Sequence, residues 1–358
     1  MENKNYPFDE KEEFKDVGMY NAVPKPYGGK AVPMRRFNTP ITPKENFELM
    51  CKGQMPLWMP NITLDFNFIQ PMVMPDAKAR AYGGIDWFGI DWKYEPLTQA
   101  AMVRPGTRRL SDITAWKEEL LPSWPDLNAI DWAKDYEENY APILDPDRPT
   151  MFCIVNGYFE RLADLTDFSD TFCYLLEEPE AIEEFYTKLD DFHIELFRIA
   201  KEYYHADIVT FHDDMGSQQN VFMAPATFNE ILLPHYQKLT KAAHDMGLLV
   251  NLHSCGNVAR QIPGFIEAGF DYWEGQDNCN NKVGLMEEYG AELGQVGVYL
   301  VPAGCSQEDF EAEIKNRVET LGKTGRYIAY YVETDPSRSP NGFELLYKYS
   351  RIQYCGEK

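Results

Sequence analysis

The residues best suited to chemistry are His253 and Cys255, which follow the apolar run of residues 248–252. A short apolar run of this kind is typical of a buried parallel strand. Residues i and i+2 of a strand point to the same face, so the imidazole and the thiol should leave the strand end side by side. Both are ligand types that zinc prefers. The alternative is a buried cysteine beside a hydrogen-bonded histidine, without a metal.

Acidic residues follow other short apolar runs in the same way. In a parallel α/β fold the chemistry lies where strands end and loops begin, so these carboxylates are candidates for metal binding or for acid–base catalysis. The alternative is that a carboxylate caps the following helix, and this applies above all to Asp213. The four residues are Asp213, Asp214, Glu274 and Glu333.

We predict a zinc site formed by His253, Cys255 and Glu333. Three protein ligands with an open fourth position are typical of catalytic zinc, whereas a structural site would use four protein ligands. Glu274 is the reserve candidate for the third ligand. Cys305 is a poorer one, because it lies in a predicted loop before a helix.

The elements that position these residues follow from the hydrophobic pattern. From residue 150 onward, short apolar runs alternate with longer amphipathic segments, which predicts a parallel sheet. Eight such units would close into a TIM (β/α)8 barrel of about 250 residues. We expect one barrel domain over 41–358 after an N-terminal arm over 1–40. Within the domain we expect a first strand at 56–64 and an irregular, aromatic-rich insertion at 66–147.

Composition restricts the partners. The 358 residues carry a net charge of −23, which argues against nucleic acid and anionic membranes because both require basic patches. No segment reaches the roughly 18 apolar residues of a membrane helix, and the N-terminus lacks the apolar core of a secretory signal. The 7 cysteines show no spacing typical of a disulfide framework. These features predict a cytoplasmic protein with reduced thiols.

Two motifs carry a resemblance to a known family. The run DDMGSQ at 213–218 and the run HSCGN at 253–257, with Pro225 and its predicted helix between them, resemble the uroporphyrinogen decarboxylase superfamily. The likeness extends roughly from residue 42 to the C-terminus. It is closest to the branch of zinc-dependent, corrinoid-linked methyltransferases of the O-demethylase type.

The resemblance implies a TIM barrel, a zinc ion bound by His253 and Cys255, and a separate corrinoid protein as partner. The third zinc ligand in that branch is usually a cysteine after the last strand, and in this sequence the position falls on Glu333. The implied reaction moves a methyl group between a small substrate and Co(I) of the corrinoid, with zinc as Lewis acid. A carboxylate ligand makes the metal harder than a thiolate would, which favours an O-methylated substrate.

The aromatic content of 14% suits an aromatic methyl ether. Asp214 is expected to bind a substrate hydroxyl or to orient His253, and Asp213 is the second candidate catalytic carboxylate. Substrate contacts are expected from residues near the predicted strand ends, namely Asn156, Tyr158, Phe159, Gln218, Trp273, Gln276, Tyr330 and Tyr331.

Two other functions are compatible with the residues. One is a metal-independent decarboxylase, and the other is a non-catalytic barrel that binds a corrinoid, a porphyrin or an aromatic ligand. A sequence that resembled the decarboxylase itself would carry an N-terminal Arg-x-x-Gly-Arg-Tyr motif. This sequence lacks the motif, and Arg35 and Arg36 form the nearest basic pair. Methyl transfer is therefore the favoured prediction. A homodimer is compatible with the sequence.

Overall fold

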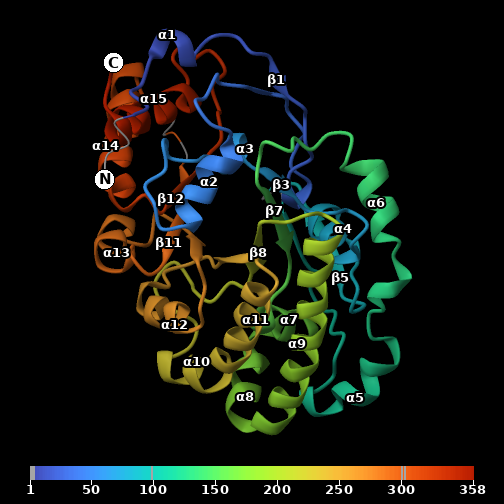
Figure 1. Cartoon of the computed structure of the whole chain (residues 1–358). Coiled ribbons are helices and arrows are strands. Elements are labelled where there is room, and N and C mark those ends of the chain that lie inside the picture. Colours follow the sequence, from blue (N-terminus) through green and yellow to red (C-terminus); the bar gives the residue numbers. More distant parts are fainter. Residues whose placement is uncertain (1–4, 98–99, 300, 302–303) are drawn as a thin grey trace.

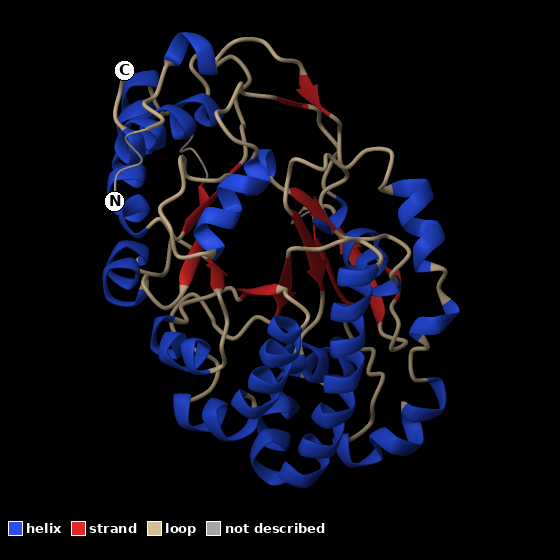
Figure 2. Ribbon diagram, in the orientation of Figure 1, coloured by secondary structure: helices blue, strands red, loops and turns tan. Residues whose placement is uncertain are grey.

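The fold is built on a curled sheet of seven parallel strands, as seen in a computed structural model that describes residues 5–97, 100–299, 301 and 304–358. Figure 2 shows the strands inside and the helices outside. Neighbours in the sheet follow the chain order, so each strand pairs with the next one along the chain. The strands are β3 (Asn67–Ile69), β7 (Thr150–Ile154), β8 (Ile208–His212), β9 (Leu249–His253), β10 (Tyr272–Gly275), β11 (Gly294–Tyr299) and β12 (Tyr327–Tyr331).

The helices between the strands bury one apolar face each. In α9 (Pro179–Glu202), Ile182, Phe185, Leu189 and Leu196 are buried at helical spacing, and a proline occupies the first turn. The other helices of this layer are α7 (Tyr158–Leu165), α8 (Phe168–Glu177), α10 (Pro225–Ile231), α11 (Leu233–Asp245), η5 (Ala259–Gln261), α12 (Ile262–Glu267), α13 (Lys282–Tyr289), α14 (Gln307–Leu321), η6 (Gly322–Thr324) and α15 (Gly342–Cys355).

The ring closes at a bridge rather than at an eighth full strand. Asn61 pairs in parallel with Ala329 of β12, at one edge of the sheet. Six residues later in the chain, β3 begins at the other edge. The predicted strand at 56–64 is wrong in this respect. Pro56 and Pro60 have no backbone N–H to donate to a ladder, and the Asn61 side chain caps α3 (Ile62–Asp65) instead. The predicted α/β barrel class is confirmed.

The N-terminal end of the barrel is covered by α2 (Pro43–Cys51), which begins with the predicted capping box of Thr42 and Glu45. Its Phe47 and Met50 pack on Phe66 and other interior residues. The arm before it contains α1 (Glu10–Glu13), β1 (Met19–Tyr20), η1 (Pro26–Gly28) and β2 (Met34–Arg35).

The arm is joined to the C-terminal helix by buried contacts. Glu13 forms an ion pair with Arg351 of α15 at 2.8 Å, and the Arg351 side chain is fully buried. Phe8 bridges Glu357, so the arm and the end of the chain run side by side (Figure 1). The arm is therefore packed on the barrel over its described residues.

The insertion at 66–147 is more regular than predicted. It contains α4 (Pro75–Tyr82) and an antiparallel sheet of β4 (Gly84–Ile85), β5 (Asp91–Glu95) and β6 (Ala100–Val103). Its tryptophans form a layer against α9, where Trp116 contacts Phe185 and Trp87 contacts Phe192. Among the helices of the described residues, none is long and apolar enough to cross a lipid bilayer. The remaining elements are η2 (Ile113–Ala115), α5 (Trp116–Glu119), η3 (Leu121–Ser123), η4 (Leu127–Ala129) and α6 (Trp132–Asn139).

Candidate metal centre

Two histidines meet at the carboxyl ends of neighbouring strands. His212 of β8 and His253 of β9 are partners in the parallel register, and their rings stack with centroids 4.3 Å apart and planes 10° apart. Asp214 lies two residues after β8, with its Oδ1 3.8 Å from Nε2 of His253. One donor atom from each of these three residues lies within 4.8 Å of the others. This is the geometry of a candidate metal site.

Each histidine is oriented by its own carboxylate. Glu274 of β10 lies 2.8 Å from Nδ1 of His253, and Glu160 of α7 lies 2.6 Å from Nδ1 of His212. With Nδ1 used in this way, Nε2 of each ring is left as the ligand atom. Asn251 donates to the other oxygen of Glu274 at 3.2 Å. A carboxylate behind each ring is the usual arrangement around metal-binding histidines.

The charges of this cluster shift its pKa values. Burial would raise the pKa of Glu160, but the charge and hydrogen bond of His212, with Arg80, lower it to about 2. Burial would likewise lower the pKa of His253, but the charge of Glu274 and hydrogen bonds to Cys255 and Glu274 raise it well above its usual range. The carboxylates of Glu160 and Glu274 are therefore anionic and favour positive charge at the centre.

Cys255 lies at the edge of the same group. Its Sγ is 3.4 Å from Nε2 of His253, and its backbone N–H donates to Oδ1 of Asp214 at 2.7 Å. The next residue, Gly256, has φ of +85°, and a Cβ there would lie 2.1 Å from the carbonyl carbon of Gly216. Glycine is required for this turn, which brings the loops after β8 and β9 into contact.

Asp213 points away from the metal-binding group. It is fully buried and accepts hydrogen bonds from the backbone N–H groups of Phe159 and Glu160 at 3.0 and 2.9 Å, and from the Tyr236 hydroxyl. Gly157 permits this contact, since a Cβ there would lie 2.5 Å from the Asp213 carboxyl. Burial, with the charge of Glu160, raises the pKa of Asp213 to about 7. Asp213 thus fixes the start of α7 and, through it, Glu160.

Glu333 lies elsewhere in the structure. Its carboxylate accepts from the Tyr331 hydroxyl at 2.5 Å and from the backbone N–H of Asp335 at 2.9 Å. The Tyr331 ring packs on Phe310 and Phe343, on the side of α14 and α15. The proposed set of His253, Cys255 and Glu333 is therefore not brought together. The reserve residue Glu274 lies behind His253, as its hydrogen-bond partner.

A cavity of about 540 Å³ opens beside His253 and Cys255. Gln276 lies on its wall and hydrogen-bonds Gln218, so both predicted substrate residues are near the centre. Tyr330 faces the barrel interior, where it contacts Phe68. The lining residues are His253, Cys255, Glu274, Gly275, Gln276, Asp277, Asn278, Val298 and Arg317.

The other predicted substrate residues do not line this cavity. Tyr158 donates to Asp190 of α9 at 2.7 Å, and Phe159 stacks on Phe222. Trp273 is fully buried in the core between the sheet and the helices. Tyr331 is also fully buried, against Phe310 of α14 and Phe343 of α15. Asn156 donates to Asp164, one turn along α7 from Glu160.

Three residues at the centre were missed from the sequence, namely His212, Tyr27 and the Glu160 that orients His212. His212 ends the apolar run that precedes Asp213, and its partnership with His253 depends on the strand register. Tyr27 comes from the arm, and its ring centroid lies 5.8 Å from that of His212. The position of His212 at a strand end was the available signal, whereas no local pattern marks Tyr27.

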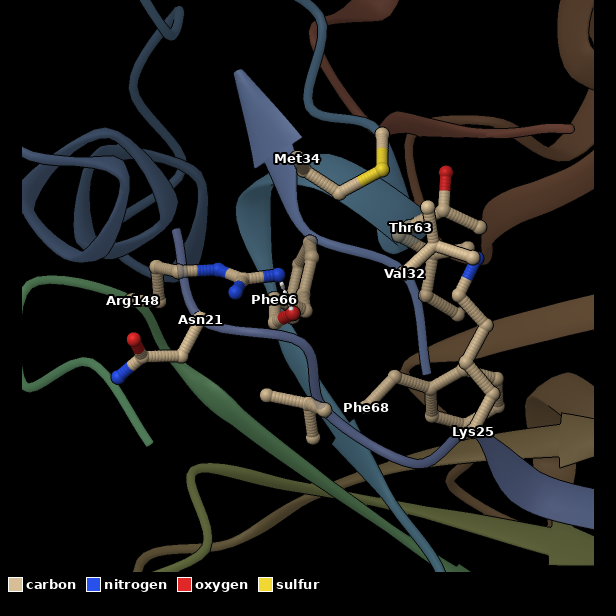
Figure 3. A pocket seen from close by; sticks show the side chains of 10 residues that line it. Asn21, Lys25, Val32, Met34, Thr63, Phe66, Phe68 and Arg148 are labelled. Atoms are coloured by element: carbon tan, nitrogen blue, oxygen red, sulfur yellow. Dashed lines mark hydrogen bonds between the residues drawn. The ribbon is translucent and has the colours of Figure 1, made fainter. Parts of the chain in front are cut away.

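A second pocket, next to the arm, is too small for a substrate. Its volume is about 20 Å³, close to the space of a single water. Figure 3 shows Arg148 reaching Phe66, whose carbonyl oxygen accepts its hydrogen bond. Among the described residues, no histidine, cysteine or carboxylate lines it. The residues are Asn21, Val23, Lys25, Val32, Met34, Ile62, Thr63, Phe66, Phe68 and Arg148.

Comparison with known proteins agrees with this architecture. Residues 146–330 match the family model for uroporphyrinogen decarboxylase (URO-D). No curated protein sequence matches the chain. A solved structure of a methyltransferase from Methanosarcina mazei is similar in fold, with a TM-score of 0.62 and 14% identity over 88% of this chain and 99% of that chain.

Two further solved structures show weaker similarity. A D-psicose 3-epimerase from Clostridium cellulolyticum H10 has a TM-score of 0.35 and 10% identity, over 69% of this chain and 88% of that chain. A sugar phosphate isomerase/epimerase from Parabacteroides distasonis has a TM-score of 0.30 and 11% identity, over 62% of this chain and 75% of that chain.

Proposed function

We propose that this chain, which belongs to the uroporphyrinogen decarboxylase family, is a zinc-dependent methyltransferase. The proposed reaction moves a methyl group from a small O-methylated substrate, of the aromatic methyl ether type, to Co(I) of a corrinoid protein. The similarity in fold to a methyltransferase supports this branch of the family. The proposed zinc rests on the geometry of the site, and the proposed corrinoid partner and O-methylated substrate rest on the resemblance to the corrinoid-linked branch of the family.

The observation that carries the proposal is the meeting of His212, Asp214 and His253 with a carboxylate behind each ring. The donor set fits zinc, which takes imidazole nitrogen, carboxylate oxygen and thiolate sulfur. We propose His212, Asp214 and His253 as ligands, with Cys255 in reach of the same ion. One carboxylate and one thiolate would neutralise Zn²⁺.

Bound zinc would supply a Lewis acid for the oxygen that carries the methyl group. In the proposed transfer the carbon–oxygen bond breaks, its electron pair stays on the oxygen, and a proton is then needed to form the free hydroxyl. The methyl carbon passes to the reduced cobalt of the partner. The chain must therefore hold the ether oxygen at the centre and leave the opposite side open to the partner.

The residues of the chain divide these tasks. Glu274 and Glu160 hold the two imidazoles in place. The cavity of about 540 Å³ beside Cys255 provides room for a small aromatic ring, and Gln276 offers a polar contact on its wall. Asp214 fixes the backbone of Cys255, so it positions the thiol whether or not it also binds the metal.

The test measures zinc per chain by plasma mass spectrometry and methyl transfer from 2-methoxyphenol to Co(I) cobalamin by cobalt absorbance. We expect about one zinc per chain in the wild type, and loss of both zinc and transfer in His253→Ala/Cys255→Ser. Glu333→Gln is the matched control and should retain both.

Two results would overturn the proposal. Equal zinc content in the wild type and the double variant would remove the metal site. Metal-independent turnover of a porphyrinogen, without methyl transfer, would instead favour a decarboxylase.

A further inference from the structure

A second binding site is indicated by Arg80 of α4. Its side chain is 17% exposed, and its NH2 lies 3.6 Å from Oε1 of Glu160. Its guanidinium carbon lies 4.8 Å from the centre of the Trp92 ring. Within the described part of the chain it makes no hydrogen bond, although a guanidinium carries five N–H donors. The cation is largely enclosed and its donors are unused.

Arg161 of α7 shows what this structure does with an arginine that only supports the fold. Its side chain is 1% exposed, and it forms ion pairs with Asp86 at 2.9 Å and with Asp76. Two buried carboxylates thus accept hydrogen bonds from this guanidinium. Enclosing a cation without such partners is unfavourable. Glu160 balances the charge of Arg80, but the contrast with Arg161 indicates that the donors of Arg80 are left for an acceptor that the chain does not supply.

Arg80 faces a cleft of about 370 Å³ between β6 and the end of α7. The apolar part of its wall includes Trp92, Val103 and Phe168. The size suits a small molecule with an apolar body and one charged end. Arg104 at the rim is already paired with Asp91, at 2.6 Å.

Two carboxyls line the cleft. Asp167, at its exposed rim, accepts a hydrogen bond from the backbone N–H of Ser169 at the start of α8, and the other carboxyl is that of Asp164. Burial, with the charge of Glu160, raises its pKa to about 8 in spite of Arg80. Asp164 is therefore largely protonated at neutral pH, so it does not repel an anion and can donate a hydrogen bond. Asp164 also accepts a hydrogen bond from the Asn156 amide.

We propose that this cleft binds a small organic carboxylate, with the carboxylate on Arg80 and the apolar body against Trp92 and Phe168. A planar guanidinium suits this role because it can form two parallel hydrogen bonds to one carboxylate. The site stands whether or not the chain transfers methyl groups. Because Arg80 contacts Glu160, which holds His212, the carboxylate is either the far end of a substrate at the metal centre or a separate ligand.

The test is calorimetric titration of the full chain with benzoate, using benzamide as the uncharged match. We expect saturable binding of benzoate and at least tenfold weaker binding of benzamide. Arg80→Gln should weaken benzoate binding by about 10- to 100-fold, the value of hydrogen bonds to a charged group. Arg104→Gln removes a charge from the same rim and should leave the affinity unchanged. Circular dichroism checks that both variants are folded.

Equal affinity for benzoate and benzamide, or no change in a folded Arg80→Gln, would overturn the proposal. The two sources of the carboxylate are separated by repeating the titration with 4-methoxybenzoate on the zinc-loaded wild type and on His253→Ala. If one molecule spans both sites, only the methoxy compound loses affinity in that variant. A separate ligand binds both proteins equally.

Discussion

The ends of β9 and β12 both carry polar residues, but these residues lie on different sides of the sheet. At β9, His253 faces the barrel interior with Glu274 behind it. At β12, Tyr330 faces the interior, whereas Tyr331 and Glu333 lie on the side of the helices. Both ends obey the same alternation of side chains along a strand. A polar residue at a strand end reaches the barrel centre only if its position matches the inward face.

The largest effect expected from this comparison is on zinc affinity at the β9 end. His253→Ala and His212→Ala each remove a proposed ligand atom. We expect each to weaken zinc binding by more than the roughly 10- to 100-fold that is typical for loss of an outer hydrogen-bond partner. Competition with a zinc chelator measures it. Wild-type affinity in both variants would show that the two histidines are only core residues.

A smaller effect is expected when His253 stays and its support is removed. Glu274→Gln keeps the size of the side chain but removes the charge that orients the ring. We expect a loss of zinc affinity of roughly 10- to 100-fold, measured by the same competition. Asn251→Ala is the milder variant, since Glu274 keeps its charge and its contact with His253 and loses only the hydrogen bond from Asn251. An unchanged zinc affinity in Glu274→Gln would contradict the proposed role of Glu274 in holding His253 for the metal.

The smallest effect is expected at β12, and on folding alone. Glu333→Gln weakens the bond to the Tyr331 hydroxyl, so the free energy of unfolding should fall by about 1 kcal/mol. Tyr331→Phe should lower the free energy of unfolding by a similar amount. The double variant should lose little more, because both substitutions remove the same hydrogen bond. Urea denaturation measures this. Zinc content should remain at the wild-type value; a loss of zinc in Glu333→Gln would restore it as a ligand.

The barrel could be predicted because alternation of apolar runs and amphipathic segments is a local signal. His253 and Cys255 could be singled out for the same reason, since two residues separated by one must share a face. The inward face of β12 could not be assigned, because parallel strands are buried on both sides and Ile328 and Ala329 look alike in sequence. Glu333 was misplaced for that reason.

The partners of the histidines could not be predicted either. Glu160 comes from α7 and Tyr27 from the arm, so their positions depend on packing between distant parts of the chain. Most of the aromatic residues expected at the substrate pack outside the barrel interior, as Tyr158 does against Asp190; Tyr330 is the exception. Aromatic side chains bury large areas, so core packing competes with any binding role.

The central claim is that one metal ion binds where β8 and β9 end. Crystals soaked in zinc and measured on both sides of the zinc absorption edge would locate it directly. We predict one anomalous peak within bonding distance of His212 and His253, with Asp214 or Cys255 completing the site. A peak at Glu333, or an ordered His212–His253 pair without a peak, would contradict the account.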